Sequence, residues 1–197
     1  MAQRKNSHHN GHDQNDSLLQ QDSKHDIAHE GETGKTFRAN FHDREGRAVL
    51  IVRVGKQNTK GVEGNLRHYV YLLENAILNL PEGQEQMIWL IDFSEFSIST
   101  YMSVRLAQEM IHVLQNHYPG RLTVAFLYNP PRIFEAFWKF VYPKSKESVE
   151  LMKSYFDPKN LPKAFGGNAS LEYNHKEFSK LMAEDEKKAA KFWGFDD

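Results

Sequence analysis

The run Gln86–Phe93 is almost continuously apolar, and it constrains the fold more than any other segment of this 197-residue chain. A strand that is apolar along its whole length needs cover on both faces, as parallel strands have inside an α/β sheet. A second strand pattern, Arg121–Tyr128, follows at a distance that leaves room for one helix. These two segments predict a sheet at the centre of the molecule.

Helix and strand patterns alternate around these two strands. Two β-rich runs, Lys35–Asn40 and Ala48–Val54, flank a polar turn and predict a β-hairpin. Asn129-Pro130-Pro131 opens a further helix, while Phe140–Tyr142 could instead form a short strand. Apolar residues at helical spacing predict four more helices, over Gly61–Leu80, Ser99–Tyr118, Ser145–Phe156 and Lys176–Lys191. This order is typical of an α/β fold with a mixed sheet.

The first 34 residues differ in composition from the rest of the chain. They are rich in His, Asn, Gln, Asp and Ser and have no periodic apolar face. Such a segment cannot bury enough surface to offset the entropy lost when its backbone is ordered. We therefore predict a disordered tail over residues 1–34, a folded domain over 35–170, and a C-terminal amphipathic helix and tail over 171–197.

Charge and cysteine content exclude several classes of protein. The chain has 25 Lys and Arg against 26 Asp and Glu, without a basic stripe, so no nucleic-acid partner is expected. Cysteine is absent, which excludes disulfides, thiolate metal sites and a cysteine nucleophile. The apolar runs are far shorter than the roughly 20 residues of a membrane span, and no signal-peptide segment is present at the start. These features predict a cytoplasmic protein.

Catalytic motifs are missing from the sequence. It contains no Gly-x-Ser-x-Gly elbow, Walker loop or Gly-x-Gly-x-x-Gly fingerprint. His25 and His29 have the spacing of a zinc helix, but Asp26 stands where a metalloprotease needs Glu, and a solvated His-rich tail is the commoner explanation. Asp92 is either a catalytic carboxylate or, as we favour, the cap of the next turn. His112 and His117 have no evident partner, so we expect neither an enzyme nor a metal or cofactor.

Large aromatic side chains are abundant, and they permit two interpretations. They either form an ordinary core or line a cavity for an apolar ligand, since such pockets are concave and mainly apolar. Composition alone does not separate the two. The set comprises Trp89, Phe93, Phe96, Tyr101, Phe126, Tyr128, Phe134, Phe137, Trp138, Phe140 and Tyr142.

Several ordered motifs resemble the CRAL-TRIO lipid-binding domain, in particular its branch of phosphatidylinositol/phosphatidylcholine transfer proteins. They are Met87–Phe93, Asn116–Leu122, Asn129–Pro131, Asn160–Pro162 and Phe165–Gly167. The resemblance runs from about Glu32 to Gly167. It implies a mixed β-sheet, covered by helices, that forms the floor of a deep apolar pocket for one phospholipid, with a mobile helix as the gate.

The resemblance also implies a function and a set of site residues. We expect binding of a phosphatidylinositol-like phospholipid, its transfer between membranes, and transient contact with a membrane surface. The phospholipid would be a ligand rather than a cofactor, and the sequence does not set the oligomeric state. Trp89 and Phe126 are expected on adjacent strands in the pocket floor. Arg121 is either a headgroup contact or a surface cation. The predicted lipid-binding residues are Met87, Trp89, Tyr101, Arg121, Phe126, Tyr128, Phe134 and Phe137.

The chain departs from the family pattern at several places. Gly120 stands where the transfer branch has a Glu, and Met87 and Trp89 stand where hydroxyl residues for phosphatidylcholine would align. The gate segment expected between Lys139 and Phe140 is missing, as is the usual helical N-terminal lobe, so the chain resembles a truncated or alternatively spliced member. The alternative function is therefore a gate-less module that contacts proteins or membranes without lipid transfer.

A loose series of lysines permits two interpretations, a membrane contact or a solvated face. It could touch an anionic membrane, each charge contributing up to about 1 kcal/mol. Interruption by Glu147, Glu150 and Asp157 slightly favours a solvated face instead. The series is Lys139, Lys144, Lys146, Lys153, Lys159 and Lys163.

Overall fold

A five-stranded mixed sheet forms the centre of the computed structural model, which describes residues 27–97, 104–130, 139–141 and 145–193. The strand order along the sheet is the order along the chain. β1 and β2 are antiparallel, and the three following pairs are parallel. The strands are β1 (Thr36–His42), β2 (Ala48–Arg53), β3 (Met87–Asp92), β4 (Leu122–Tyr128) and β5 (Lys139–Val141). The predicted hairpin, the two central strands and the short strand near Phe140 are confirmed.

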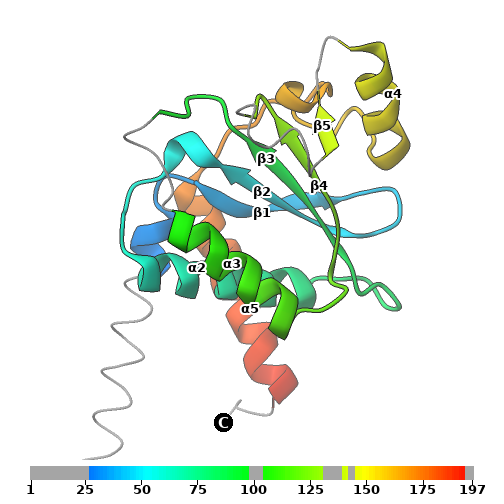
Figure 1. Cartoon of the computed structure of the whole chain (residues 1–197). Coiled ribbons are helices and arrows are strands. Elements are labelled where there is room, and N and C mark those ends of the chain that lie inside the picture. Colours follow the sequence, from blue (N-terminus) through cyan, green and yellow to red (C-terminus); the bar gives the residue numbers. More distant parts are fainter. Residues whose placement is uncertain (1–26, 98–103, 131–138, 142–144, 194–197) are drawn as a thin grey trace, which may run out of the picture.

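Helices α2 (Val62–Leu78) and α3 (Val104–His117) connect consecutive parallel strands. Right-handed crossovers between strands in simple sequential order place both helices on the same face of the sheet. Figure 1 shows α5 (His175–Trp193) on that side too, whereas α4 (Lys146–Tyr155) lies near β5 on the other side. Short 3₁₀ turns occur at Val54–Lys56 and Lys163–Phe165. The predicted helix that begins at Asn129 lies mostly outside the described residues.

Both faces of the sheet are buried, as the apolar run of β3 predicts. Ile88 and Leu90 face a cluster completed by the α4 region and the segment after it. Met87 faces the opposite cluster, which contains Leu72 and Leu73 of α2. Because successive side chains of a strand point to opposite faces, one continuous apolar strand serves both clusters.

Residues 27–34 are folded, which corrects the predicted boundary of the disordered tail. A helical turn spans residues 27–31. The buried carboxylate of Glu30 accepts hydrogen bonds from Lys35 Nζ and from Thr59 Oγ1, the latter at 2.6 Å. Lys35 Nζ also donates to Asn65 Oδ1 at 2.8 Å. An ion pair and side-chain hydrogen bonds to its carbonyl groups hold this segment, and the absence of apolar periodicity does not record such contacts. Residues 1–26 lie outside the described residues.

Helix α5, assigned from sequence to a separate C-terminal part, packs against the sheet. Met182 belongs to the core cluster on the α2 face. Arg38 of β1 donates from Nη2 to Asp185 Oδ2 at 2.6 Å, and the Asp185 side chain is fully buried. Lys188 Nζ lies 3.2 Å from the other carboxylate oxygen. A buried charge pair therefore joins the last helix to the first strand.

Asp185→Ala is expected to lower the free energy of unfolding by about 3–5 kcal/mol, because it leaves the buried guanidinium of Arg38 without its counter-charge. Equilibrium unfolding in urea measures this loss. Glu184→Ala removes an exposed carboxylate from the same helix and is the control, with an expected change below about 0.5 kcal/mol. Equal losses in the two variants would contradict the structural role assigned to Asp185.

Candidate functional site: an apolar cavity under helices α2 and α3

A cavity of about 170 Å³ lies between strands β2–β4 and helices α2 and α3. Its apolar wall combines residues of three strands, of the turn after β2 and of α3. The lining comprises Val52, Val54, Trp89, Ile91, Phe93, Ala107, Met110, Ile111 and Leu127. This volume is below the roughly 300–1,000 Å³ of typical small-molecule sites, so the described residues enclose room for part of a lipid-sized molecule.

Strand register builds the floor of this cavity. Val52 pairs with Ile91, and Ile91 pairs with Leu127, so three aliphatic side chains form one row across the sheet. Two residues earlier, Trp89 pairs with Ala125 on β4. The small Ala125 side chain leaves space beside the indole ring of Trp89. Because successive side chains of a strand point to opposite faces of the sheet, this ring points toward the helices.

Two buried hydrogen-bond donors on the cavity wall lack partners within the described part of the chain. They are the Tyr69 hydroxyl on α2 and the Trp89 Nε1–H group on β3. Their rings meet edge to face, with centroids 5.8 Å apart. Burial raises the pKa of Tyr69 above its ordinary value, with a smaller contribution from Tyr118, so the phenol keeps its proton. Unpartnered buried donors are costly, and an oxygen acceptor in the cavity would satisfy them.

One end of the cavity is polar. Lys35, Gln57 and Asn65 line it and belong to the hydrogen-bonded network around Glu30. Burial is the main cause that lowers the pKa of Lys35, and Glu30 opposes it. Arg53 donates from Nε to Gly34 O and from Nη2 to Thr33 O, both at 2.8 Å. These cations are thus occupied with partners of the protein itself.

The predicted site residues that the structure describes do not gather around one cavity. Trp89 lines it, whereas Met87 is fully buried against α2. Phe126 and Tyr128 lie on the opposite face, where Phe126 packs against Tyr155 with ring centroids 5.0 Å apart. Trp89 and Phe126 are on adjacent strands as predicted, but they share no floor, because Phe126 pairs with Leu90 rather than with Trp89.

Arg121 lies at the junction between α3 and β4, at the opposite end of β4 from Leu127. Its Nη1 donates to the carbonyl of Glu85 at 2.9 Å, and it does not line the cavity. Tyr101, Phe134 and Phe137 are outside the described residues, as is Trp138.

Other polar residues singled out from the sequence have local roles. Asp92 Oδ1 accepts a hydrogen bond from Ser94 N at 2.7 Å, which confirms the predicted turn cap. His112 and His117 are exposed on α3. Among the described residues, no three metal-binding side chains come close enough to hold an ion. Within the described part of the chain, every helix is too short or too polar to cross a bilayer.

Sequence reasoning missed His68, which lines this cavity and is only 3% exposed. Asn65, His68 and Tyr69 share the buried face of α2 with Leu72. Their helical spacing places two polar residues on an apolar face, and this pattern could have indicated buried polar groups beside a cavity.

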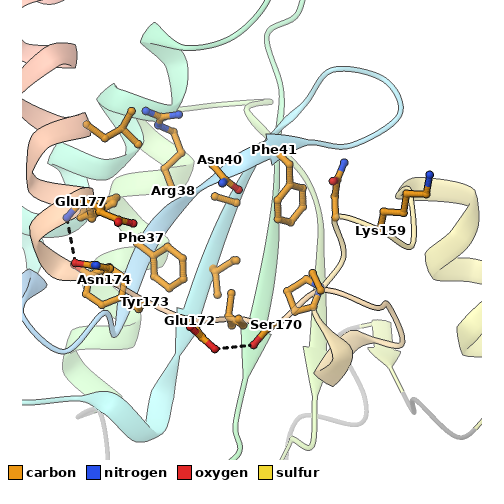
Figure 2. A pocket seen from close by; sticks show the side chains of 18 residues that line it. Phe37, Arg38, Asn40, Phe41, Lys159, Ser170, Glu172, Tyr173, Asn174 and Glu177 are labelled. Carbon is orange, nitrogen blue, oxygen red and sulfur yellow. Dashed lines mark hydrogen bonds between the residues drawn. The ribbon is translucent and has the colours of Figure 1, made fainter.

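A second hollow, of about 410 Å³, follows the outer edge of β1 (Figure 2). Figure 2 shows Phe37 and Arg38 on opposite sides of the strand, so the hollow wraps around its edge. Its rim is polar: Ser170 donates to Glu172 at 3.3 Å, and Asn174 accepts from the Glu177 amide at 3.3 Å. This mixed, open surface is a poorer fit to an apolar ligand than the cavity under α2 and α3.

A sequentially ordered mixed sheet with an apolar cavity beneath its crossover helices defines a domain suited to an apolar ligand. The chain belongs to the CRAL/TRIO domain family, whose model matches residues 31–167. Members of this family bind and transfer lipids.

Three comparisons illustrate the relationship. A CRAL-TRIO domain-containing protein of Schizosaccharomyces pombe is 32% identical over 166 residues, which cover 81% of this chain and 16% of that protein. The phosphatidylinositol transfer protein PDR17 of Saccharomyces cerevisiae is 29% identical over 161 residues, or 76% of this chain and 46% of PDR17. The chain thus spans less than half of either relative.

The crystal structure of Sfh5 shares the fold, with a TM-score of 0.53 at 17% identity, covering 82% of this chain and 68% of Sfh5. At that identity the likeness concerns the fold alone.

The stability of the protein is expected to fall as the pH drops from about 6.5 toward 3. Burial, with the nearby charges of Lys35 and His175, lowers the pKa of His68 to about 3. In this pH range His68 therefore binds a proton in the unfolded chain but not in the folded chain. This difference lowers the free energy of unfolding by up to about 1.4 kcal/mol for each unit by which the pH falls.

Urea unfolding at a series of pH values should give a shallower slope for His68→Gln than for the unaltered chain. Gln108→Ala, on the exposed side of α3, changes no titratable group and is the control, since it should leave the slope unchanged. Parallel slopes for all three proteins would contradict a neutral, buried His68.

Proposed function

We propose that this domain binds a phospholipid of the phosphatidylinositol type, with part of one acyl chain in the cavity under α2 and α3. The observation that carries the proposal is an apolar wall interrupted by two unpartnered donors, Tyr69 and Trp89. An acyl ester offers what this wall lacks, namely oxygen acceptors attached to a long apolar chain. PDR17, a relative over 76% of the chain, is named a phosphatidylinositol transfer protein, which supports the choice of lipid.

The energetics favour an acyl chain over a polar ligand. Each methylene removed from water contributes about 0.8 kcal/mol, so a few methylenes against Val52, Ile91 and Leu127 supply useful affinity without any charged contact. The ester oxygens would accept hydrogen bonds from the two donors. The described cavity would hold the part of the chain nearest the ester.

A second candidate function is lipid or membrane binding without transfer. Tyr128 of β4 pairs with Val141 of β5, and Phe126 pairs with Lys139. Residues 129–138 therefore make the whole connection between two parallel strands, and a crossover needs about 10–12 residues. That length leaves little chain for a separate lid of the kind a transfer protein opens and closes.

Contact with a membrane surface is part of both candidates. Lys146, Lys153, Lys159 and Lys163 are exposed in and after α4, but Lys153 is paired with Glu150 at 2.9 Å. Exposed acidic residues among them reduce the field, so we propose a weak and transient contact with anionic lipid.

Native mass spectrometry of the purified chain is expected to reveal a bound phospholipid. Ala107→Phe, which adds a ring to the α3 wall of the cavity, should remove most of that lipid while leaving the thermal midpoint nearly unchanged. Gln108→Phe places the same ring on the exposed side of α3 and should retain the lipid. A lipid-free chain, or equal loading in both variants, would refute binding in this cavity.

Vesicle-to-vesicle transfer of a fluorescent phosphatidylinositol is expected to be weak or absent for this chain, with adsorption to vesicles instead. A variant with a family-type gate segment inserted between Trp138 and Lys139, ahead of β5, should transfer faster. Equal transfer by both chains would show that no lid function is missing.

A further inference from the structure

A third cavity, of about 460 Å³, lies between residues 27–31, α2 and α5. Its volume falls within the range of small-molecule sites. Small and apolar side chains create the space, among them Ala28, Phe178, Met182, Ala183 and Ala189. They come from segments at opposite ends of the chain, so the cavity exists only because α5 packs beside α2.

His68 provides a buried polar group on the wall of this cavity. Its imidazole forms no hydrogen bond with the part of the chain that the structure describes, although the residue is 97% buried. Nε2 lies 3.5 Å from the position that a Cβ on Gly31 would occupy, so this ring atom faces the wall at Gly31. Gly31 itself lines the cavity.

The neighbouring histidine is already engaged, which distinguishes it from His68. The Tyr173 hydroxyl donates to Gly31 O at 2.7 Å and lies 3.0 Å from His175 Nδ1. Because that hydroxyl has given its own hydrogen to the carbonyl, His175 Nδ1–H is the donor between them. His68 thus remains the polar group of the wall that a ligand would satisfy.

The wall favours an uncharged ligand. A neutral imidazole offers one donor and one acceptor, which match the two roles of a hydroxyl group. Among the described residues that line the cavity, Glu186 carries a negative charge, and it accepts a hydrogen bond from the Tyr71 hydroxyl at 3.2 Å. Its negative charge and the absence of a lining cation within the described residues oppose a phosphate or carboxylate here.

We propose that this cavity is a second ligand site, for an uncharged, largely apolar alcohol whose oxygen bonds to the His68 imidazole. The site is separate from the phospholipid cavity and does not depend on the proposed function. His68 lies in the wall of both cavities, so the two sites are neighbours.

Fluorescence titration of the full chain with dehydroergosterol, an uncharged apolar alcohol, tests the proposal. Saturable binding is expected, with cholesterol as an effective competitor and cholesterol sulfate at least about tenfold weaker. The imidazole nitrogens of His68 should shift in the ¹⁵N spectrum when the probe binds. No saturable binding, or equal competition by the sulfate, would overturn the proposal.

Matched variants locate the probe. His68→Leu should weaken binding roughly tenfold, in line with the loss of a buried hydrogen bond. Ala183→Phe fills the cavity from an exposed position of α5 and should abolish sterol binding while retaining the co-purified phospholipid. Ala107→Phe, which fills the phospholipid cavity, should retain sterol binding. Loss of sterol binding in Ala107→Phe with retention in Ala183→Phe would place the probe in the first cavity and refute a second site.

Discussion

Sequential order of the parallel strands is the constraint on which the rest of the structure depends. Since β2, β3 and β4 are neighbours in the sheet as in the chain, their right-handed crossovers carry α2 and α3 onto one face. Within the described residues, the other face is covered by α4 and the segment that ends near Phe165. Each face of the sheet therefore has a different kind of cover, built from a different part of the chain.

This asymmetry explains where the cavities lie. The face under α4 is closed by large interlocking rings, including Phe126, Phe156 and Phe165, all fully buried. The face under the crossover helices is packed by side chains of mixed size, and small residues such as Ala107 and Ala125 leave space beside Trp89. The helix face therefore encloses an apolar cavity with two unpartnered donors, Tyr69 and Trp89. The ring face is filled by aromatic side chains at its centre and is hollowed along the edge of β1, where Phe37 and Ile51 line the hollow of about 410 Å³.

Much of the fold could be predicted from the sequence, because the apolar periods are strong and the turns contain Pro or Gly. The apolar run Met87–Phe93 predicts that both faces of the sheet are covered. Pro81 and Gly120 mark the ends of α2 and α3 within a few residues. Residues 27–34 escaped prediction because Glu30 and Lys35 hold them by charge, which apolar patterns do not record.

The site was harder to predict than the fold. A list of aromatic residues does not state which side of a strand each one faces, so Trp89 and Phe126 were grouped although the register separates them. His68 escapes a prediction based on apolar spacing, because that spacing does not record which polar residues lie on the buried face of a helix. Arg121 illustrates a third limit, since a motif fixes a position along the chain but not the distance to a cavity.

The pairing of Arg38 with Asp185 joins residues 147 positions apart and has a consequence for the order of folding. Contacts of such separation form late, since the loop between the partners must close first. During synthesis the first strand leaves the ribosome well before the helix that neutralises its arginine, and the apolar face of the hairpin stays uncovered meanwhile. Completion of the nascent domain therefore waits for α5, and this interval is when the growing chain is most exposed to aggregation.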